Sequence, residues 1–254
     1  MKRIIYPLLP FTLLIALAAC PKDQKKDSRK IVVDGEMVEL YTPADGDTFS
    51  WVLITGRAAT KQGFVQLDLQ GNDASMIARR GVTLSSKLPD TAEIMMVIAV
   101  PEDKAPQEAR IRAYTMAIEQ AGKTDAATIP VYVIPGSEEA HGTILRFYNA
   151  LDTGNFEIAY KLLSPMGQGY PNLYGGEAAF AARPKIAELK NWKKDDERLR
   201  VLRMKPETMY DLPKDNLFCY RAWVEHTLGE QKSVEAYYIF LTRQSDGAFL
   251  LYKP

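Results

Sequence analysis

The segment ILRFYNALDTGNFEIAYKLLSP, from Ile144 to Pro165, decides how the C-terminal half of this chain folds. Its apolar side chains recur at the three- and four-residue spacing of an amphipathic helix, at Ile144, Phe147, Tyr148 and Leu151. The helical pattern ends in a turn sequence at residues 152–154, and a second apolar stretch begins after it. The segment therefore predicts two consecutive helices joined by a tight turn.

Polar residues mark where both helices begin. Ser137 can cap the first helix, and the carboxylates of Glu138 and Glu139 complement the dipole of its first turn. Asn155 can cap the second helix, which we expect over Phe156–Leu163. A third helix is expected over residues 177–192, and four strands follow it, at Arg198–Lys205, Asn216–Leu228, Ser233–Arg243 and Ala248–Lys253.

Helices followed by an antiparallel meander predict an α+β layer fold for residues 136–254. With this order of elements, the segment from Ile144 to Pro165 closely resembles the opening of nuclear transport factor 2-like (cystatin-like) domains. The resemblance implies a cone, in which a curved antiparallel sheet wraps around the first helix and leaves a cavity or a dimer face. Fold alone does not define the function of such a domain.

Residues 37–135 show a different periodicity, typical of an all-β domain. Short apolar runs alternate with turn residues, and seven strands are expected, at Met37–Tyr41, Trp51–Ala58, Phe64–Gln70, Ala74–Leu84, Ala92–Val100, Ala109–Glu119 and Thr128–Ile134. The stretch ELYTPADGDTFSWVLITGRA, from Glu39 to Ala58, resembles the immunoglobulin-like domains of bacterial envelope and spore-germination lipoproteins. The resemblance implies a β-sandwich that acts as a spacer or an adhesive module.

The first twenty residues, MKRIIYPLLPFTLLIALAAC, indicate export. They combine a positive start, an apolar run from Ile4 to Ala18 and small residues before Cys20. A cysteine at this place resembles the lipobox of bacterial lipoproteins, whose cysteine sulfur receives a diacylglycerol when the preceding peptide is removed. The resemblance implies that residues 1–19 are a signal peptide and that acylated Cys20 anchors the chain in a lipid bilayer.

Two other interpretations of this N-terminus are weaker. A transmembrane helix needs roughly 20 apolar residues, whereas this run is shorter and contains Pro7 and Pro10. A soluble secreted protein would need no cysteine at the cleavage point. The residues after Cys20 are charged, so we expect a polar tether over residues 20–36. The expected location is the cell envelope, on the outer face of the cytoplasmic membrane or in the outer membrane.

Composition excludes several functions. The chain has 32 Lys and Arg against 32 Asp and Glu, so no net field favours nucleic acid. Lipidation of Cys20 would leave Cys219 without a disulfide partner, and we expect Cys219 to be a buried small apolar residue. Only two histidines occur, and no spacing of His, Asp or Glu indicates a metal site or a cofactor.

Candidate functional residues all lie in the C-terminal half. We expect His141 to be exposed in the first helical turn and His226 to lie at a strand end. Arg221, Glu225 and Glu235 could form a polar cluster, or else a cross-strand charge ladder on a solvated face. The candidate pocket or interaction face comprises Tyr148, Tyr174, Trp192, Tyr220, Arg221, Trp223, Glu225, His226, Glu235 and Tyr238.

The leading hypothesis is an envelope lipoprotein that binds or scaffolds without catalysis, because no catalytic set is evident. Its cone would present a surface for an envelope protein partner or for a homodimer. A second hypothesis, a small-molecule carrier, requires a closed apolar cavity in the cone. A third, an isomerase, dehydratase or hydrolase, requires Arg221, Glu225, Glu235 or His226 to converge inside such a cavity.

Overall fold

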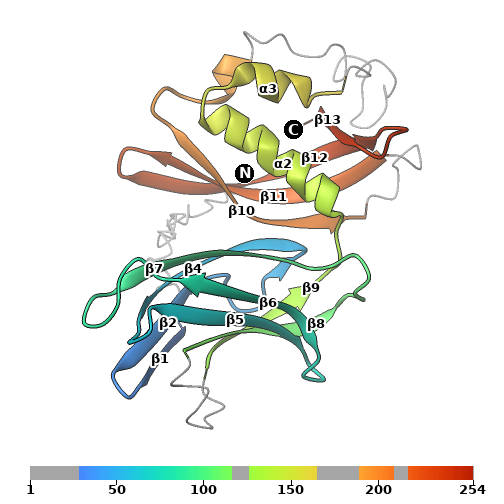
Figure 1. Ribbon diagram of the computed structural model, residues 1–254. Helices are drawn as coiled ribbons and strands as arrows, with labels where there is room; N and C mark the ends of the chain where they lie inside the picture. Colours follow the sequence, from blue (N-terminus) through green and yellow to red (C-terminus); the bar gives the residue numbers. More distant parts are fainter. Residues whose placement is uncertain (1–28, 116–125, 165–188, 209–216, 254) are drawn as a thin grey trace, which may run out of the picture.

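The computed structural model describes residues 29–115, 126–164, 189–208 and 217–253. This part of the chain is mostly β, with two sheets and two α-helices (Figure 1). The elements are β1 (Arg29–Val33), β2 (Glu36–Thr42), β3 (Thr48–Phe49), β4 (Trp51–Ala59), β5 (Phe64–Gly71), β6 (Met76–Thr83), β7 (Ala92–Ala99), β8 (Gln107–Tyr114), β9 (Ala127–Val133), α2 (Glu138–Asp152), α3 (Phe156–Lys161), the 3₁₀ turn η2 (Lys190–Trp192), β10 (Arg198–Glu207), β11 (Leu217–Leu228), β12 (Gln231–Arg243) and β13 (Phe249–Lys253).

Strands β1 to β9 form two layers around one apolar core. One layer contains β1, β2, β4 and β7, and the other has the order β3-β9-β8-β5-β6. Along β5, Val65, Leu67 and Leu69 are completely buried, whereas Gln66 and Gln70 alternate with them and are partly exposed. Because successive side chains of a strand point to opposite faces, this alternation aims every second side chain of β5 into the core.

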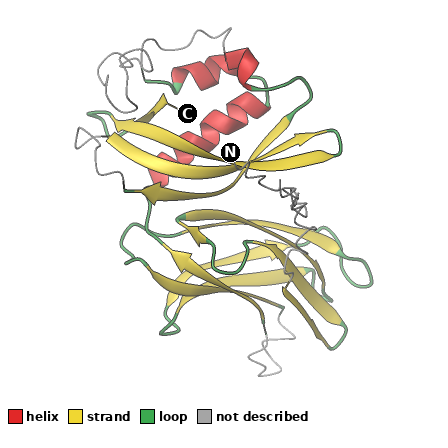
Figure 2. Cartoon of the chain, turned by 180° about the vertical axis from the view of Figure 1, so that it is seen from behind, coloured by secondary structure: helices red, strands yellow, loops and turns green. Residues whose placement is uncertain are grey.

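Strands β10 to β13 form an antiparallel sheet that curves around α2, as both views show (Figures 1 and 2). Helix α2 buries Ile144, Phe147 and Leu151 in a second apolar core, which also contains Val224 and Ile239 of the sheet. Each such side chain contributes about 1.5–3 kcal/mol when it is fully buried. The 3.6-residue period of the helix thus places these three side chains on the side of α2 that meets the sheet.

The sequence correctly predicts where both helices begin. Ser137 Oγ accepts a hydrogen bond from the Ala140 amide at 3.4 Å, and Asn155 Oδ1 accepts one from the Ile158 amide at 3.3 Å. The α3 end is joined to β13, because the Leu251 amide donates to the Leu162 carbonyl at 2.8 Å. This link holds the short helix against the far edge of the sheet.

A strand shared by both halves makes their two sheets continuous. The start of β4 pairs with β10, Trp51 opposite Met204 and Val52 opposite Arg203, while its later residues pair with β2 on the same edge. β2 and β10 therefore diverge from β4 like the arms of a fork. At the fork, Thr42 Oγ1 donates to the Leu53 carbonyl at 3.0 Å and accepts from the Thr55 amide at 2.9 Å.

The structure of the N-terminal region differs from the expectation in one respect. The polar tether expected over residues 20–36 contains a strand, because Arg29–Val33 forms β1 and pairs with β2. The pattern was missed because Val32 and Lys30 are exposed and only Val33 is buried, which is typical of an edge strand. Residues 1–19, where a signal peptide is expected, and Cys20 lie outside the described residues. Within the described residues, no helix is long and apolar enough to cross a membrane.

Candidate functional site

The C-terminal sheet distributes the expected site residues over two opposite faces. Directly paired residues of antiparallel strands point to the same side. Arg221 pairs with Tyr238 and Glu225 pairs with Val234, so these side chains share the outer face. Trp223, two residues from each, lies on this face too.

The inner face, which α2 covers, carries three further members of the set. Glu235 pairs with the buried Val224 and therefore points inward, as do Tyr220 and His226. Glu235 is thus separated from Arg221 and Glu225, and the polar cluster expected from the sequence does not form. Alternation within one strand cannot show which residue of the next strand lies opposite, and this register separated the three.

The side chains of two expected residues are not described. Tyr174 lies outside the described residues, and so does most of the helix expected over 177–192. Trp192 ends the 3₁₀ turn η2, and its side chain is not described. Tyr148 of α2 is buried against the inner face, with its ring centroid 6.3 Å from that of Tyr237.

The inner face holds a chain of four polar side chains near the end of β11. His226 Nδ1 lies 2.8 Å from Glu197 Oε1, and His226 Nε2 lies 2.9 Å from the Tyr237 hydroxyl. The same hydroxyl donates to Glu235 Oε2 at 2.7 Å. Burial raises the pKa of Tyr237 and the carboxylate of Glu235 raises it further, so this phenol keeps its proton at neutral pH.

The number of available hydrogen atoms restricts the hydrogen bonds that these four side chains can form. If Tyr237 donates to Glu235, His226 Nε2 must donate to the Tyr237 oxygen, since that oxygen has only one hydrogen. His226 Nδ1 faces the carboxylate of Glu197. Both ring nitrogens of His226 are therefore engaged by neighbouring side chains.

The outer face carries a groove at the fork, with two compartments. The first, of about 240 Å³, is lined largely by apolar side chains that include Pro43, Leu53 and Val234. The second, of about 310 Å³, contains Arg200, Glu225, Lys232 and Glu93 and is more polar. Both compartments share Tyr41, Thr42 and Leu202, so we call them together the junction groove.

Cationic and aromatic side chains border the apolar compartment. The Arg203 guanidinium carbon lies 4.0 Å from the centre of the Trp223 ring, and Arg203 forms an ion pair with Asp47. Arg221 lies 5.1 Å from the same ring and 5.3 Å from the Tyr238 ring. Burial lowers the pKa of Arg203, the Asp47 carboxylate opposes that shift, and the charge of Arg221 adds to it.

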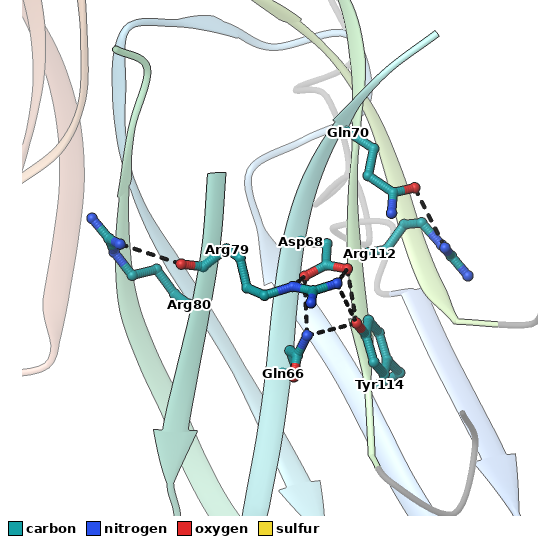
Figure 3. Close-up of polar contacts among 7 residues, drawn as sticks. All are labelled: Gln66, Asp68, Gln70, Arg79, Arg80, Arg112 and Tyr114. Atoms are coloured by element: carbon teal, nitrogen blue, oxygen red, sulfur yellow. Dashed lines mark hydrogen bonds and ion pairs between the residues drawn. The ribbon is translucent and has the colours of Figure 1, made fainter. Parts of the chain in front are cut away.

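A third polar cluster lies on the outer face of the second sheet (Figure 3). Asp68 is 1% exposed, and it accepts hydrogen bonds from Arg79 at 2.8 and 3.0 Å, from the Tyr114 hydroxyl at 2.8 Å and from Gln66 at 3.3 Å. Burial would raise the pKa of Asp68, but these donors outweigh it and hold the pKa below its usual range. The carboxylate is fully satisfied within three strands, so this cluster is structural.

His141 does not lie where the sequence placed it. It is 2% exposed, and the buried hydroxyl of Ser50, in the connection between β3 and β4, covers one side of the ring at 2.7 Å from Nε2. The Ser50 hydroxyl also reaches the Met204 carbonyl at 3.1 Å, so this contact ties α2, β4 and β10 together. Burial lowers the pKa of His141 to about 4, so the ring is neutral at pH 7. The expectation of exposure was wrong because the covering residue lies 91 positions earlier.

Cys219 is buried, as expected, and burial raises the pKa of its thiol to about 12. Sequence reasoning missed Glu197, Asp47 and Arg203 as site residues. Glu197 and Asp47 lie in connections before a strand, where no periodicity marks them. Among the described residues, no cluster of His, Cys, Asp and Glu is arranged to hold a metal ion.

Comparisons with known proteins add little. No family model matches the chain, and no curated protein matches it. A solved structure from Catenulispora acidiphila in complex with S-DNPA is 21% identical over 45% of this chain and 86% of its own, with a TM-score of 0.28. Bd1075 of Bdellovibrio bacteriovorus is 8% identical over 89% of this chain and 91% of its own, with a TM-score of 0.30.

Proposed function

We propose that this protein is an envelope lipoprotein that binds a partner protein through the junction groove. One observation carries the proposal: the groove is built by side chains of both halves, such as Thr42 and Leu202, on the face that α2 leaves uncovered. The inner face, by contrast, is packed against α2 with side chains that are completely buried, including Phe147 and Ile239. That packing favours binding on the outer face over an enclosed carrier cavity.

We also propose the finer assignment of both halves. The layers β2-β4-β7 and β9-β8-β5-β6 correspond to the A-B-E and G-F-C-C′ arrangement of immunoglobulin-like sandwiches, which supports that assignment. A curved meander around one long helix supports a nuclear transport factor 2-like cone for residues 136–254. In this proposal the sandwich acts as a spacer and also supplies one wall of the groove.

The anchor is tested by Cys20→Ser in the producing bacterium. Two or three acyl chains hold a protein stably at a membrane, whereas one chain binds only marginally. We expect the wild-type protein in the membrane fraction and the variant in the soluble fraction after cell disruption. A variant that remains in the membrane fraction would contradict lipid anchoring through Cys20.

The partner is tested by a photo-crosslinking amino acid in intact cells. The residue is placed at Val234, which lines the groove and is 51% exposed, and in a control at Met76, which is 39% exposed on the other sheet. We expect a discrete adduct with another envelope protein from position 234 and none from position 76. Trp223→Ala should weaken this adduct, because Trp223 forms part of the groove wall.

Two outcomes would count against a partner protein. An adduct that contains only this chain would identify a homodimer instead. Equal adducts from both positions would show random encounter at the membrane surface.

A second function, acid–base catalysis, is favoured by the chain from Glu197 through His226 to Tyr237. Aligned carboxylate, imidazole and phenol groups are the components that proton-transfer enzymes use. Two observations weigh against it: both ring nitrogens of His226 are already engaged, and Arg221 and Glu225 face away. Turnover of any compound in a panel of ketones, esters and alcohols, lost in both His226→Gln and Tyr237→Phe, would establish catalysis and overturn the binding proposal.

A further inference from the structure

We propose that Arg221 receives a carboxylate from an acidic segment of the partner protein, beside an apolar side chain held in the junction groove. This inference rests on the proposed function and specifies the chemistry of the partner. The outer face of β10, β11 and β12 carries an arginine that the protein itself leaves without a counter-charge.

The charges around Arg221 are the first argument. Lys205 lies directly opposite Arg221 in the β10–β11 register, and Arg203 is close enough for the two charges to interact. Like charges placed directly opposite each other destabilise a sheet. Glu207 compensates Lys205 at 3.1 Å and Asp47 compensates Arg203, but no described acidic residue pairs with Arg221.

The hydrogen bonds of Arg221 are the second argument. Its Nε is buried and has no hydrogen-bond acceptor. A buried donor without a partner costs about 1–3 kcal/mol. A ligand that offers acceptor oxygens to this guanidinium would compensate part of that cost.

The rings around Arg221 are the third argument. Trp223 and Tyr238 hold the planar group from two strands, at 5.1 and 5.3 Å, and so limit its rotation before any ligand arrives. A planar guanidinium matches the two oxygens of a carboxylate better than an ammonium does. The site is therefore organised for a carboxylate.

The position of Trp223 indicates which second group the ligand carries beside its carboxylate. The same ring borders the apolar compartment of about 240 Å³, whose lining includes Pro43, Leu53 and Val234. A ligand that fills this compartment and also reaches Arg221 needs an apolar group and an anionic group a short distance apart. Polypeptides offer this combination in neighbouring side chains, whereas an acidic polysaccharide has no apolar side chain to fill the compartment.

The experiment selects peptides on the full-length lipoprotein in detergent micelles. A random linear peptide library is selected on the wild-type protein, on Arg221→Gln, on Arg221→Glu and on the control Arg110→Gln. Arg110 is exposed on β8, in the other sheet. Far-ultraviolet circular dichroism confirms that each variant is folded before selection.

We expect wild-type protein and the Arg110 variant to enrich peptides with Asp or Glu beside a large apolar residue. Arg221→Gln should weaken binding of the best such peptide about tenfold to a hundredfold, the range for a lost hydrogen bond to a charged group. Arg221→Glu should shift the enrichment from acidic to basic residues, which a merely unfolded variant cannot do.

Three outcomes would contradict the proposal, and each would do so in a different way. Peptides that bind in the groove without an acidic residue would overturn the role of Arg221 and leave the proposed function intact. A second result is a library that yields no peptide whose binding depends on Trp223. That result would count against the proposed function itself. Binding of alginate in place of peptides, lost in Arg221→Gln, would replace the acidic peptide with an acidic polysaccharide.

Discussion

Two arginine clusters, one on each half of the molecule, use similar side chains to opposite effect. On the sandwich, Arg79 and Tyr114 converge on the carboxylate of Asp68 (Figure 3). On the C-terminal sheet, Arg221 lies beside Trp223 and a tyrosine, but no described carboxylate meets it. A cluster whose charges are all paired stabilises the fold, whereas an arginine without a counter-charge remains available to a ligand.

The largest expected effect is a change in stability with pH. It is caused by His141, which lies where the two halves of the molecule meet. His141 is neutral when folded, with a pKa of about 4 against an ordinary value near 6.5, so unfolding takes up a proton between these values. The contribution of His141 to the free energy of unfolding is therefore fully present above pH 6.5. It is lost as the pH drops toward 4, and the loss is about 3 kcal/mol. Urea unfolding at a series of pH values measures this slope.

His141→Gln should flatten that slope, because the variant has no imidazole to protonate at this position. An unchanged slope in the His141 variant would mean that the junction does not depend on a neutral imidazole. The two halves would then have to be held together mainly by the β4–β10 pairing and by Trp51 and Leu53.

The next largest effect distinguishes the two clusters directly. Asp68→Asn removes the charge that Arg79, Tyr114 and Gln66 share, so we expect the free energy of unfolding to fall by about 2 kcal/mol. Arg79 is 54% exposed and can recover water, which keeps the loss moderate. Thermal and urea unfolding measure the loss, with the exposed Asp90→Asn as the matched control. Equal stability of both variants would show that the Asp68 cluster is not structural.

The smallest expected effect is on the other cluster. Arg221→Gln removes a buried donor without an acceptor and a charge that faces Lys205, so we expect the free energy of unfolding to rise slightly, by about 1 kcal/mol. Urea unfolding of the full-length protein in micelles measures the change. A loss comparable with that of Asp68→Asn would show that Arg221 supports the fold, and the contrast between the clusters would disappear.

The fold was predictable wherever the signal is local. Caps at Ser137 and Asn155, the period of α2 and the alternation of β5 all depend on residues within one or two turns of one another. The sequence assigned β1 to a tether because its exposed residues mask its single buried side chain, Val33. Its role as a strand depends on β2, which supplies the hydrogen bonds.

The candidate site was less predictable, because it depends on register. The expected grouping of Arg221, Glu225 and Glu235 fails since Glu235 pairs with Val224 and turns inward. A shift of one residue in this pairing would have placed all three together, because side chains alternate with a period of two. The helical spacing that identified Tyr148 as an inward-facing residue was sufficient, since α2 covers the sheet directly.

The sequence by itself determined where α2 and α3 begin, the alternation of β5 and the likeness of Cys20 to a lipidated cysteine, because each depends on neighbouring residues. Only the tertiary structure decided that β4 joins the two sheets, that Ser50 buries His141 and that Arg221 lies without a counter-charge beside a groove. These features arise where segments far apart in the chain meet. Their energies depend on burial and on cross-strand neighbours. Neither of these can be derived from residues that are adjacent in the sequence.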